Sequence, residues 1–170
     1  SSYMPLPYKM LGPEDIHNSK LLFWPNNPRL KISDFRNVNY THSQLTNKEN
    51  QEKIWNMLRK NEHEVPKLAK SMMQSGFMRE KAPIVLKLSD LDRYLVLEGN
   101  RRLTAIRLIL SGKDKVAPEI RKSLEFIPCW LFELNSDEVP LEAAISRMVA
   151  EAHIKGQKAH TKIQQAHMLY

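Results

Sequence analysis

The hydrophobic pattern of the chain predicts a mixture of helices and short strands. Apolar residues recur at three- and four-residue spacing over 51–60, 65–75, 140–154 and 161–170, which is typical of amphipathic helices. Runs rich in β-branched and aromatic residues at 83–88, 93–97 and 126–133 favour strands. The first two runs flank a short turn and predict a hairpin. A further apolar run from 103 to 110 predicts a buried helix that begins directly after the second strand.

The remaining segments organise the chain into three parts. Residues 1–20 contain several prolines and are predicted to form an irregular N-terminal arm. Residues 21–135 hold the main domain, in which the polar stretch 31–48 is interpreted as a loop and 31–60 as an insertion. Residues 136–170 are predicted to form a helical extension that leads toward a further C-terminal region.

Composition narrows the class of protein. The chain has 170 residues, 42% of them hydrophobic, and this is typical of one globular domain. A net charge of +7 permits a phosphate or nucleic-acid partner without requiring one. The single cysteine, Cys129, lies in an apolar run and is interpreted as a buried structural thiol, in keeping with a reducing cytoplasm. No apolar run is long enough to span a membrane.

The junction between the second strand and the helix carries the most specific chemistry. Gly99 follows the strand, and Arg101 and Arg102 open the helix. The first amides of a helix have no intrahelical partner, and the helix dipole adds positive charge there. Guanidinium groups match phosphate geometry, and Arg102 also lies on the apolar stripe, where a charge needs a partner. The alternative is an exposed Gly-Asn turn with a basic helix start.

Other charged residues are candidates for the same site. Arg29 ends a rigid loop rich in proline and asparagine, and its alternative is a surface arginine. Glu151 and Glu98 are candidate ligands for Mg²⁺, with Glu98 alternatively clamping a guanidinium. For both carboxylates the alternative is a surface or intrahelical ion pair.

The order of these pieces resembles the N-terminal domain of ParB-like proteins, a superfamily that includes sulfiredoxin. The resemblance rests on four segments, which occur in this order: Asn27-Pro28-Arg29, Ser75-Gly76-Phe77, Pro83-Ile84-Val85 and Leu97-Glu98-Gly99-Asn100-Arg101-Arg102-Leu103-Thr104-Ala105. It implies an α/β (α+β) fold with a small mixed sheet packed with helices, followed by C-terminal helices. It also implies a nucleotide-binding domain over residues 21–135. A further C-terminal region of the helix-turn-helix type would lie outside this chain.

In this family the Gly-x-x-Arg turn, here Gly99 to Arg102 with Asn100 and Arg101 between them, binds the phosphates of CTP. A second family motif, Glu-Asn-x-x-Arg, is similar to residues 151–155, where Glu151 matches the acidic position linked to Mg²⁺. Lys155 replaces the motif arginine and keeps the charge without the bidentate fork. Sulfiredoxin has a catalytic cysteine where this chain has Asn100, so redox repair is not expected.

The resemblance implies a cytoplasmic module that binds CTP or ATP with Mg²⁺, with the nucleotide acting as a switch for DNA or dimer engagement. Phosphate would be held by Gly99, Asn100, Arg101 and Arg102, with Arg29 and Lys155 as helpers. DNA would be bound through a region outside this chain, and a homodimer is expected. Slow hydrolysis of CTP or ATP is expected to accompany binding. Metal-dependent nuclease activity is one alternative, and an ATPase for which nucleotide turnover is the purpose is another. A degenerate domain that only mediates protein contacts is a third.

Overall fold

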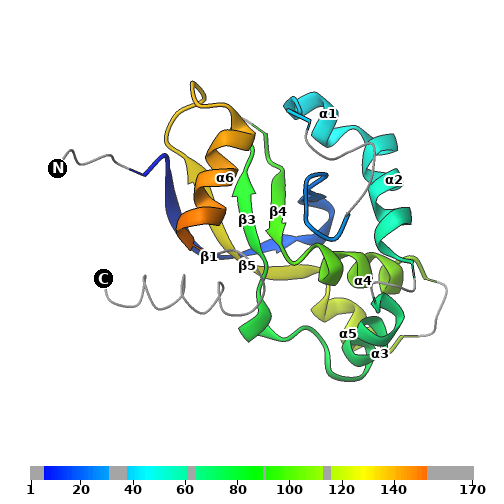
Figure 1. Ribbon diagram of the computed structural model, residues 1–170. Helices are drawn as coiled ribbons and strands as arrows, with labels where there is room; N and C mark the ends of the chain where they lie inside the picture. The colour runs from blue at the N-terminus through cyan, green and yellow to red at the C-terminus, as the bar shows by residue number, and fades with distance from the viewer. Residues whose placement is uncertain (1–5, 31–37, 61–63, 90, 113–115, 153–170) are drawn as a thin grey trace.

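The computed structural model describes residues 6–30, 38–60, 64–89, 91–112 and 116–152. Five strands form one mixed sheet in the order β1-β5-β3-β4-β2, and helices pack against it (Figure 1). The strands are β1 (Tyr8–His17), β2 (Leu21–Phe23), β3 (Ile84–Lys87), β4 (Tyr94–Glu98) and β5 (Phe126–Leu134). The helices are α1 (His42–Thr46), α2 (Lys48–Leu58), α3 (Val65–Ser75), α4 (Asn100–Leu110), α5 (Pro118–Ser123) and α6 (Leu141–Ala152). The predicted α+β class with a small mixed sheet is confirmed.

The sheet combines a hairpin with parallel pairings. β3 and β4 pair antiparallel, as the sequence predicts, while β4 pairs parallel with β2 and β3 parallel with β5. Both β3 and β4 are interior strands. Their residues point alternately to two hydrophobic clusters, with Val96 in one and Leu95 and Leu97 in the other. Because both faces are covered, these strands have continuous apolar runs instead of alternating polar residues.

Each face of the sheet has its own set of helices. The larger cluster packs α2, α3 and α4 against one face, through buried residues that include Ile54, Val65, Ala69, Met72, Leu103 and Ile106. The second cluster packs α1 and α6 against the other face, through Leu45, Ile145 and Met148. Figure 1 shows α6 over the sheet and α3, α4 and α5 grouped together at the lower right. Within the described residues, no helix has the length and hydropathy that a membrane crossing requires.

The prediction of an irregular N-terminal arm over 1–20 is wrong. Residues 8–17 form β1, which pairs antiparallel with β5 along its length at the edge of the sheet. Gly12 and Pro13 interrupt the strand pattern in the sequence, because both residue types are uncommon in strands. The register shifts between Met10 and Gly12, and an edge strand accepts a proline because only one side of it makes ladder hydrogen bonds.

The polar stretch before residue 60 contains more structure than predicted. α1 begins at a capping box, in which Thr41 and Gln44 satisfy each other's backbone amides, and this pattern is legible in the sequence. In α2, the side chain of Gln51 accepts a hydrogen bond from Phe23 N at 2.8 Å and donates to Phe23 O at 3.0 Å. It thereby closes the free edge of β2 as a neighbouring strand would. Whether 31–60 is an insertion relative to the family stays a prediction.

The other predicted helices agree closely with the structure where it describes them. The helix predicted over 65–75 is α3, and those predicted over 51–60 and 140–154 correspond to α2 and α6. The helix predicted over 161–170 lies outside the described residues. Cys129 is a buried thiol on β5, and burial raises its pKa to about 12, so the structural interpretation of this residue is supported.

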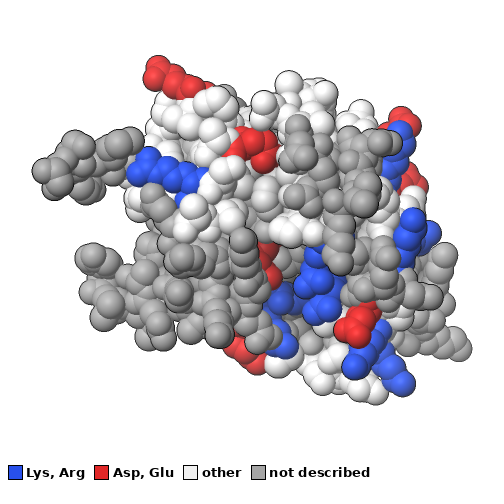
Figure 2. All heavy atoms as spheres, in the orientation of Figure 1, with Lys and Arg blue, Asp and Glu red and all other residues white. Residues whose placement is uncertain are grey.

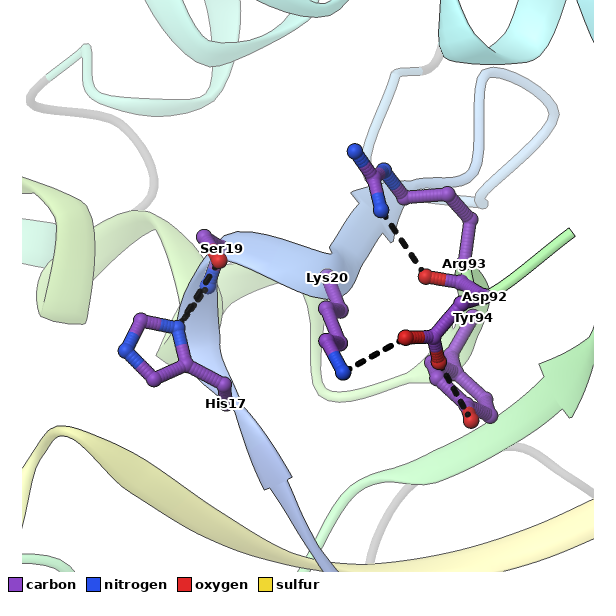
Figure 3. A network of polar contacts seen from close by, with 6 residues as sticks. All are labelled: His17, Ser19, Lys20, Asp92, Arg93 and Tyr94. Atoms are coloured by element: carbon purple, nitrogen blue, oxygen red, sulfur yellow. Dashed lines mark hydrogen bonds and ion pairs between the residues drawn. The ribbon is translucent and has the colours of Figure 1, made fainter.

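A polar network ties the starts of β2 and β4 together on the surface (Figure 3). Lys20 Nζ lies 2.6 Å from Asp92 Oδ2, and the Tyr94 hydroxyl donates to Asp92 Oδ1 at 3.0 Å. These two hydrogen bonds stabilise the charged form of the carboxylate and lower the pKa of Asp92, while burial and Asp92 raise the pKa of Tyr94. The network joins neighbouring parallel strands at the end of the sheet where they begin.

The network has a signature in a pH titration. Because the folded pKa of Asp92 is lowered, its stabilising contribution is present at neutral pH and is lost as pH falls through that folded value. We expect the side-chain carboxyl carbon of Asp92, followed by NMR, to titrate below the ordinary aspartate range. Lys20→Met should move its pKa upward. An unshifted pKa in the native chain, or one indifferent to Lys20→Met, would contradict the network.

Candidate functional site

The turn between β4 and α4 is shaped by a glycine that no other residue can replace without strain. Gly99 has φ of 113° and is the N-cap of α4, where it provides no side-chain acceptor for the first helical amides. A Cβ atom at this position would lie 2.8 Å from Pro83 Cβ. Both the backbone angle and the close approach of the Pro83 segment therefore require glycine. The resulting turn presents an uncapped helix N-terminus.

Asn100 links this turn to the end of β2, the strand that pairs parallel with β4. Its Oδ1 accepts from Trp24 N at 3.0 Å, and its Nδ2 donates to Val96 O at 2.8 Å. The side chain is 4% exposed, so its amide is not available to a ligand. The predicted phosphate contact of Asn100 could only come from its backbone amide. The side chain instead fixes the start of the loop that follows β2.

That loop delivers Arg29 to the start of α4. Asn27 is 2% exposed and holds the turn, because its Nδ2 donates to Trp24 O at 2.6 Å and its Oδ1 accepts from Arg29 N at 3.1 Å. A further backbone bond from Leu30 N to Asn27 O, at 3.1 Å, completes the turn. The role of Asn27 was not predicted, although two asparagines between prolines are a strong turn signal.

Three arginines meet where this loop approaches α4. Arg102 Nη2 lies 2.8 Å from Glu98 Oε2, and the two side chains are 14% and 19% exposed. Arg101 Nη1 lies 3.9 Å from Glu64 Oε2, at the exposed N-cap of α3. Arg29 is at the surface, yet partial burial of its guanidinium and the positive charges of Arg101 and Arg102 lower its pKa, against the opposing effect of Glu98. Figure 2 shows basic side chains gathered over the start of α4.

We call Arg29, Arg101, Arg102 and Glu98 the arginine cluster. Its guanidiniums outnumber the adjacent carboxylates, Glu98 and Glu64, and they sit at the positive end of the α4 dipole. Arg102 Nε is buried and has no hydrogen-bond partner among the described residues. Like charges, a helix dipole of the same sign and an unused donor all favour an anion at this position.

The sequence predicted most of this cluster and part of its internal pairing. It places Arg29, Arg101 and Arg102 in one site, and the structure brings them together. Glu98 clamps a guanidinium, which is one of its two predicted roles. Within the described residues, no group of three or more His, Cys, Asp and Glu side chains could hold a metal ion. Oxygen Oε2 of Glu98 is engaged by Arg102, and the Mg²⁺ role of Glu98 stays a prediction.

The second predicted part of the site cannot be placed. Glu151 belongs to the last turn of α6, but its side chain lies outside the described part of the structure, and so does the whole of Lys155. Their predicted contacts with metal and phosphate therefore stay predictions.

Comparisons with known proteins find similarity among solved structures alone. No protein-family model and no curated protein matches the chain. A solved structure of the C-terminally truncated chromosome-partitioning protein ParB from Caulobacter crescentus, complexed with CTP-gamma-S, aligns with a TM-score of 0.40 and 18% sequence identity. The alignment covers 82% of this chain and 53% of that one, so the chain spans about half of the ParB structure. We therefore base the function on the geometry of this chain's own residues.

The double role of Asn100 in the turn can be tested by unfolding. Asn100→Ala removes the acceptor of Trp24 N and a donor to Val96 O in a buried place, and an unsatisfied buried group costs about 1–3 kcal/mol. We expect urea denaturation to show a loss of at least about 2 kcal/mol. Asn56→Ala, at an exposed site within α2, is the control and should change stability by less than about 0.5 kcal/mol. Equal effects of the two changes would refute the role assigned to Asn100.

A pair of glycine substitutions separates backbone strain from crowding. Gly12 and Gly99 have φ of 119° and 113°, but a Cβ at Gly12 meets nothing within 4 Å. Gly12→Ala should cost only the strain of about 1–2 kcal/mol. Gly99→Ala should cost roughly 1–3 kcal/mol more, because it also crowds the Pro83 segment. Similar losses at both positions, measured by chemical denaturation, would show that the close approach at Gly99 is relaxed in solution.

Proposed function

We propose that the chain is a nucleotide-binding module of a ParB-like, DNA-associated protein and that it holds the triphosphate of CTP or ATP at the arginine cluster. The observation that carries the proposal is an uncapped helix N-terminus with Arg101 and Arg102 in its first turn, to which the loop that carries Arg29 is tied through Asn100. This arrangement costs free energy in the ligand-free protein, because like charges repel each other and oppose the helix dipole. A polyanion relieves both costs when it binds.

The chemistry of the cluster favours a triphosphate over a single carboxylate. Guanidinium groups form bidentate hydrogen bonds with phosphate oxygens, and the first amides of α4 point to the same region. Arg102 is held in place by Glu98, while Arg29 and Arg101 are more exposed and able to adjust to a ligand. We expect Gly99 to allow the phosphates to approach the backbone closely, since it has no side chain there.

The proposal also covers what nucleotide binding does to the protein as a whole. By the resemblance of its motifs to the ParB family, the nucleotide acts as a switch for dimer formation or DNA engagement, with DNA bound outside this chain. Mg²⁺ would accompany the triphosphate, and slow hydrolysis would reset the switch. Glu151 and Lys155 are the residues proposed to assist there. Turnover by an ATPase or a nuclease is the competing activity, and metal-dependent cutting of plasmid DNA that Glu151→Ala abolishes would favour it.

Titration calorimetry with the four ribonucleoside triphosphates, with and without Mg²⁺, tests the proposal. A hydrogen bond to a charged group contributes about 1.5–3 kcal/mol, so Arg102→Ala should weaken binding roughly 10- to 150-fold. Arg102→Lys, which keeps the charge without the fork, should fall in between. Arg93→Ala is the control, because Arg93 lies at the exposed hairpin tip, far along the chain from the arginine cluster, and its guanidinium donates to Asp92 O. Absence of binding by every triphosphate, or equal losses in Arg102→Ala and Arg93→Ala, would refute the site.

Arg29 gives a test with two effects of different sign. Its guanidinium is repelled by Arg101 and Arg102, so Arg29→Gln should leave the stability of the ligand-free protein unchanged or slightly higher. The same change should weaken triphosphate binding by roughly tenfold, since a charged donor is lost. Thermal denaturation with and without nucleotide measures both effects on one sample. A destabilised free protein with unchanged affinity would mean that Arg29 has a purely structural role.

A further inference from the structure

A cavity of about 480 Å³ opens on the other side of the loop that carries Arg29. Its wall is formed by Trp24 and Asn26 of that loop, by residues 38–39, and by α6. The apolar part comes from Trp24, Val38, Ile145 and Val149, and the polar part includes Glu142. The lining is divided about equally between apolar and polar residues, and a volume of this size lies within the range of sites for small organic ligands.

Glu142 gives the cavity a fixed hydrogen-bond acceptor. Trp24 Nε1 donates to Glu142 Oε1 at 3.1 Å, which orients the carboxylate and leaves its second oxygen able to accept from a ligand. Burial and the negative charge of Glu142 together raise the pKa of the nearby Tyr40 hydroxyl. An anionic group is therefore disfavoured in this cavity, whereas an amino group on a planar ring is favoured.

The cavity and the arginine cluster are both bordered by the short loop that follows β2. Asn26 lines the cavity and Arg29 belongs to the cluster, and three residues span at most about 11 Å even when fully extended. The turn held by Asn27 brings the two closer still. Trp24, which lines the cavity with its side chain, is also bonded through its backbone amide to Asn100 at the start of α4. A nucleoside triphosphate is long enough to reach both.

We infer that this cavity receives the base of the bound nucleotide and that Glu142 selects bases with an exocyclic amino group. The inference rests on the proposed function and adds the part of the ligand that the arginine cluster does not contact. The two sites have opposite charge, so the orientation of the ligand is fixed, with phosphates at the cluster and the base beside Glu142. Cytosine, adenine and guanine carry such an amino group, whereas uracil has none and presents a carbonyl oxygen, which the carboxylate repels, where cytosine has its amino group.

Calorimetry with CTP, ATP, UTP and inorganic triphosphate separates base recognition from phosphate binding. In the native chain we expect CTP and ATP to bind about tenfold or more tightly than UTP, since UTP lacks the exocyclic amino donor and presents a carbonyl oxygen to the carboxylate in its place. Glu142→Gln keeps the size of the side chain and should remove most of this preference. Its affinity for inorganic triphosphate should not change.

A second pair of variants tests the cavity itself. Ser146 lines the cavity and Ala143, which does not, is exposed on the same helix. Ser146→Phe should lower the affinity for CTP and ATP toward that of inorganic triphosphate, while Ala143→Phe should leave all affinities unchanged.

The outcomes distinguish this inference from the proposed function. If inorganic triphosphate binds but CTP, ATP and UTP bind equally, with no effect of either cavity variant, the base lies elsewhere and the phosphate site stands. If Glu142→Gln strengthens binding of all four ligands alike, Glu142 acts only through its long-range charge, and base selection is refuted. If inorganic triphosphate and the nucleotides all fail to bind, the proposed function and this inference fall together.

Discussion

The side chain of Asn100 is the contact on which the site depends. It bonds Trp24 N at one end and Val96 O at the other, and so extends the pairing of β2 and β4 by one side-chain bridge. Because it is buried, both bonds form in a place where an unmet partner would be costly. This bridge sets the position of the loop after β2 relative to α4. Arg29 reaches the arginine cluster from that loop.

The electrostatics of the cluster run against the stability of the free protein. Arginines at a helix N-terminus oppose the dipole, and partial burial together with the charges of Arg101 and Arg102 lowers the pKa of Arg29. The fold tolerates this because Glu98 neutralises the most buried member, Arg102. The charge of Arg107, farther along α4, is stabilised differently, because its Nη2 donates to the backbone oxygens of Asn18 and Leu21. Arg107 is thus anchored by the backbone, whereas the cluster keeps charge that a ligand can use.

The elements that the sequence predicted well are those whose pattern reflects local physics. The apolar spacing of α3 and the runs of β3 and β4 follow from the faces that each element buries, and the hairpin follows from the turn between its strands. β1 was missed because a glycine and a proline interrupt it, and both are acceptable only at the edge of a sheet. α1 was missed as well, although its capping box is a local signal. Asn100 was assigned to phosphate because the sequence alone does not show whether a polar side chain beside a glycine turn is buried or exposed to a ligand.

By itself the sequence determined the glycine turn, the arginines that begin α4 and the helical and strand character around them, because short-range sterics and hydrophobic periodicity are written in neighbouring residues. The resemblance of its motifs already placed Arg29, more than 70 positions away, with Arg101 and Arg102, and only the tertiary structure decided that Glu98 is committed to Arg102. It also decided that Trp24 and Glu142 share a cavity on the other side of the Arg29 loop. These pairings depend on the parallel register of β2 with β4 and on how α6 packs on the sheet, which are long-range contacts that local patterns do not encode.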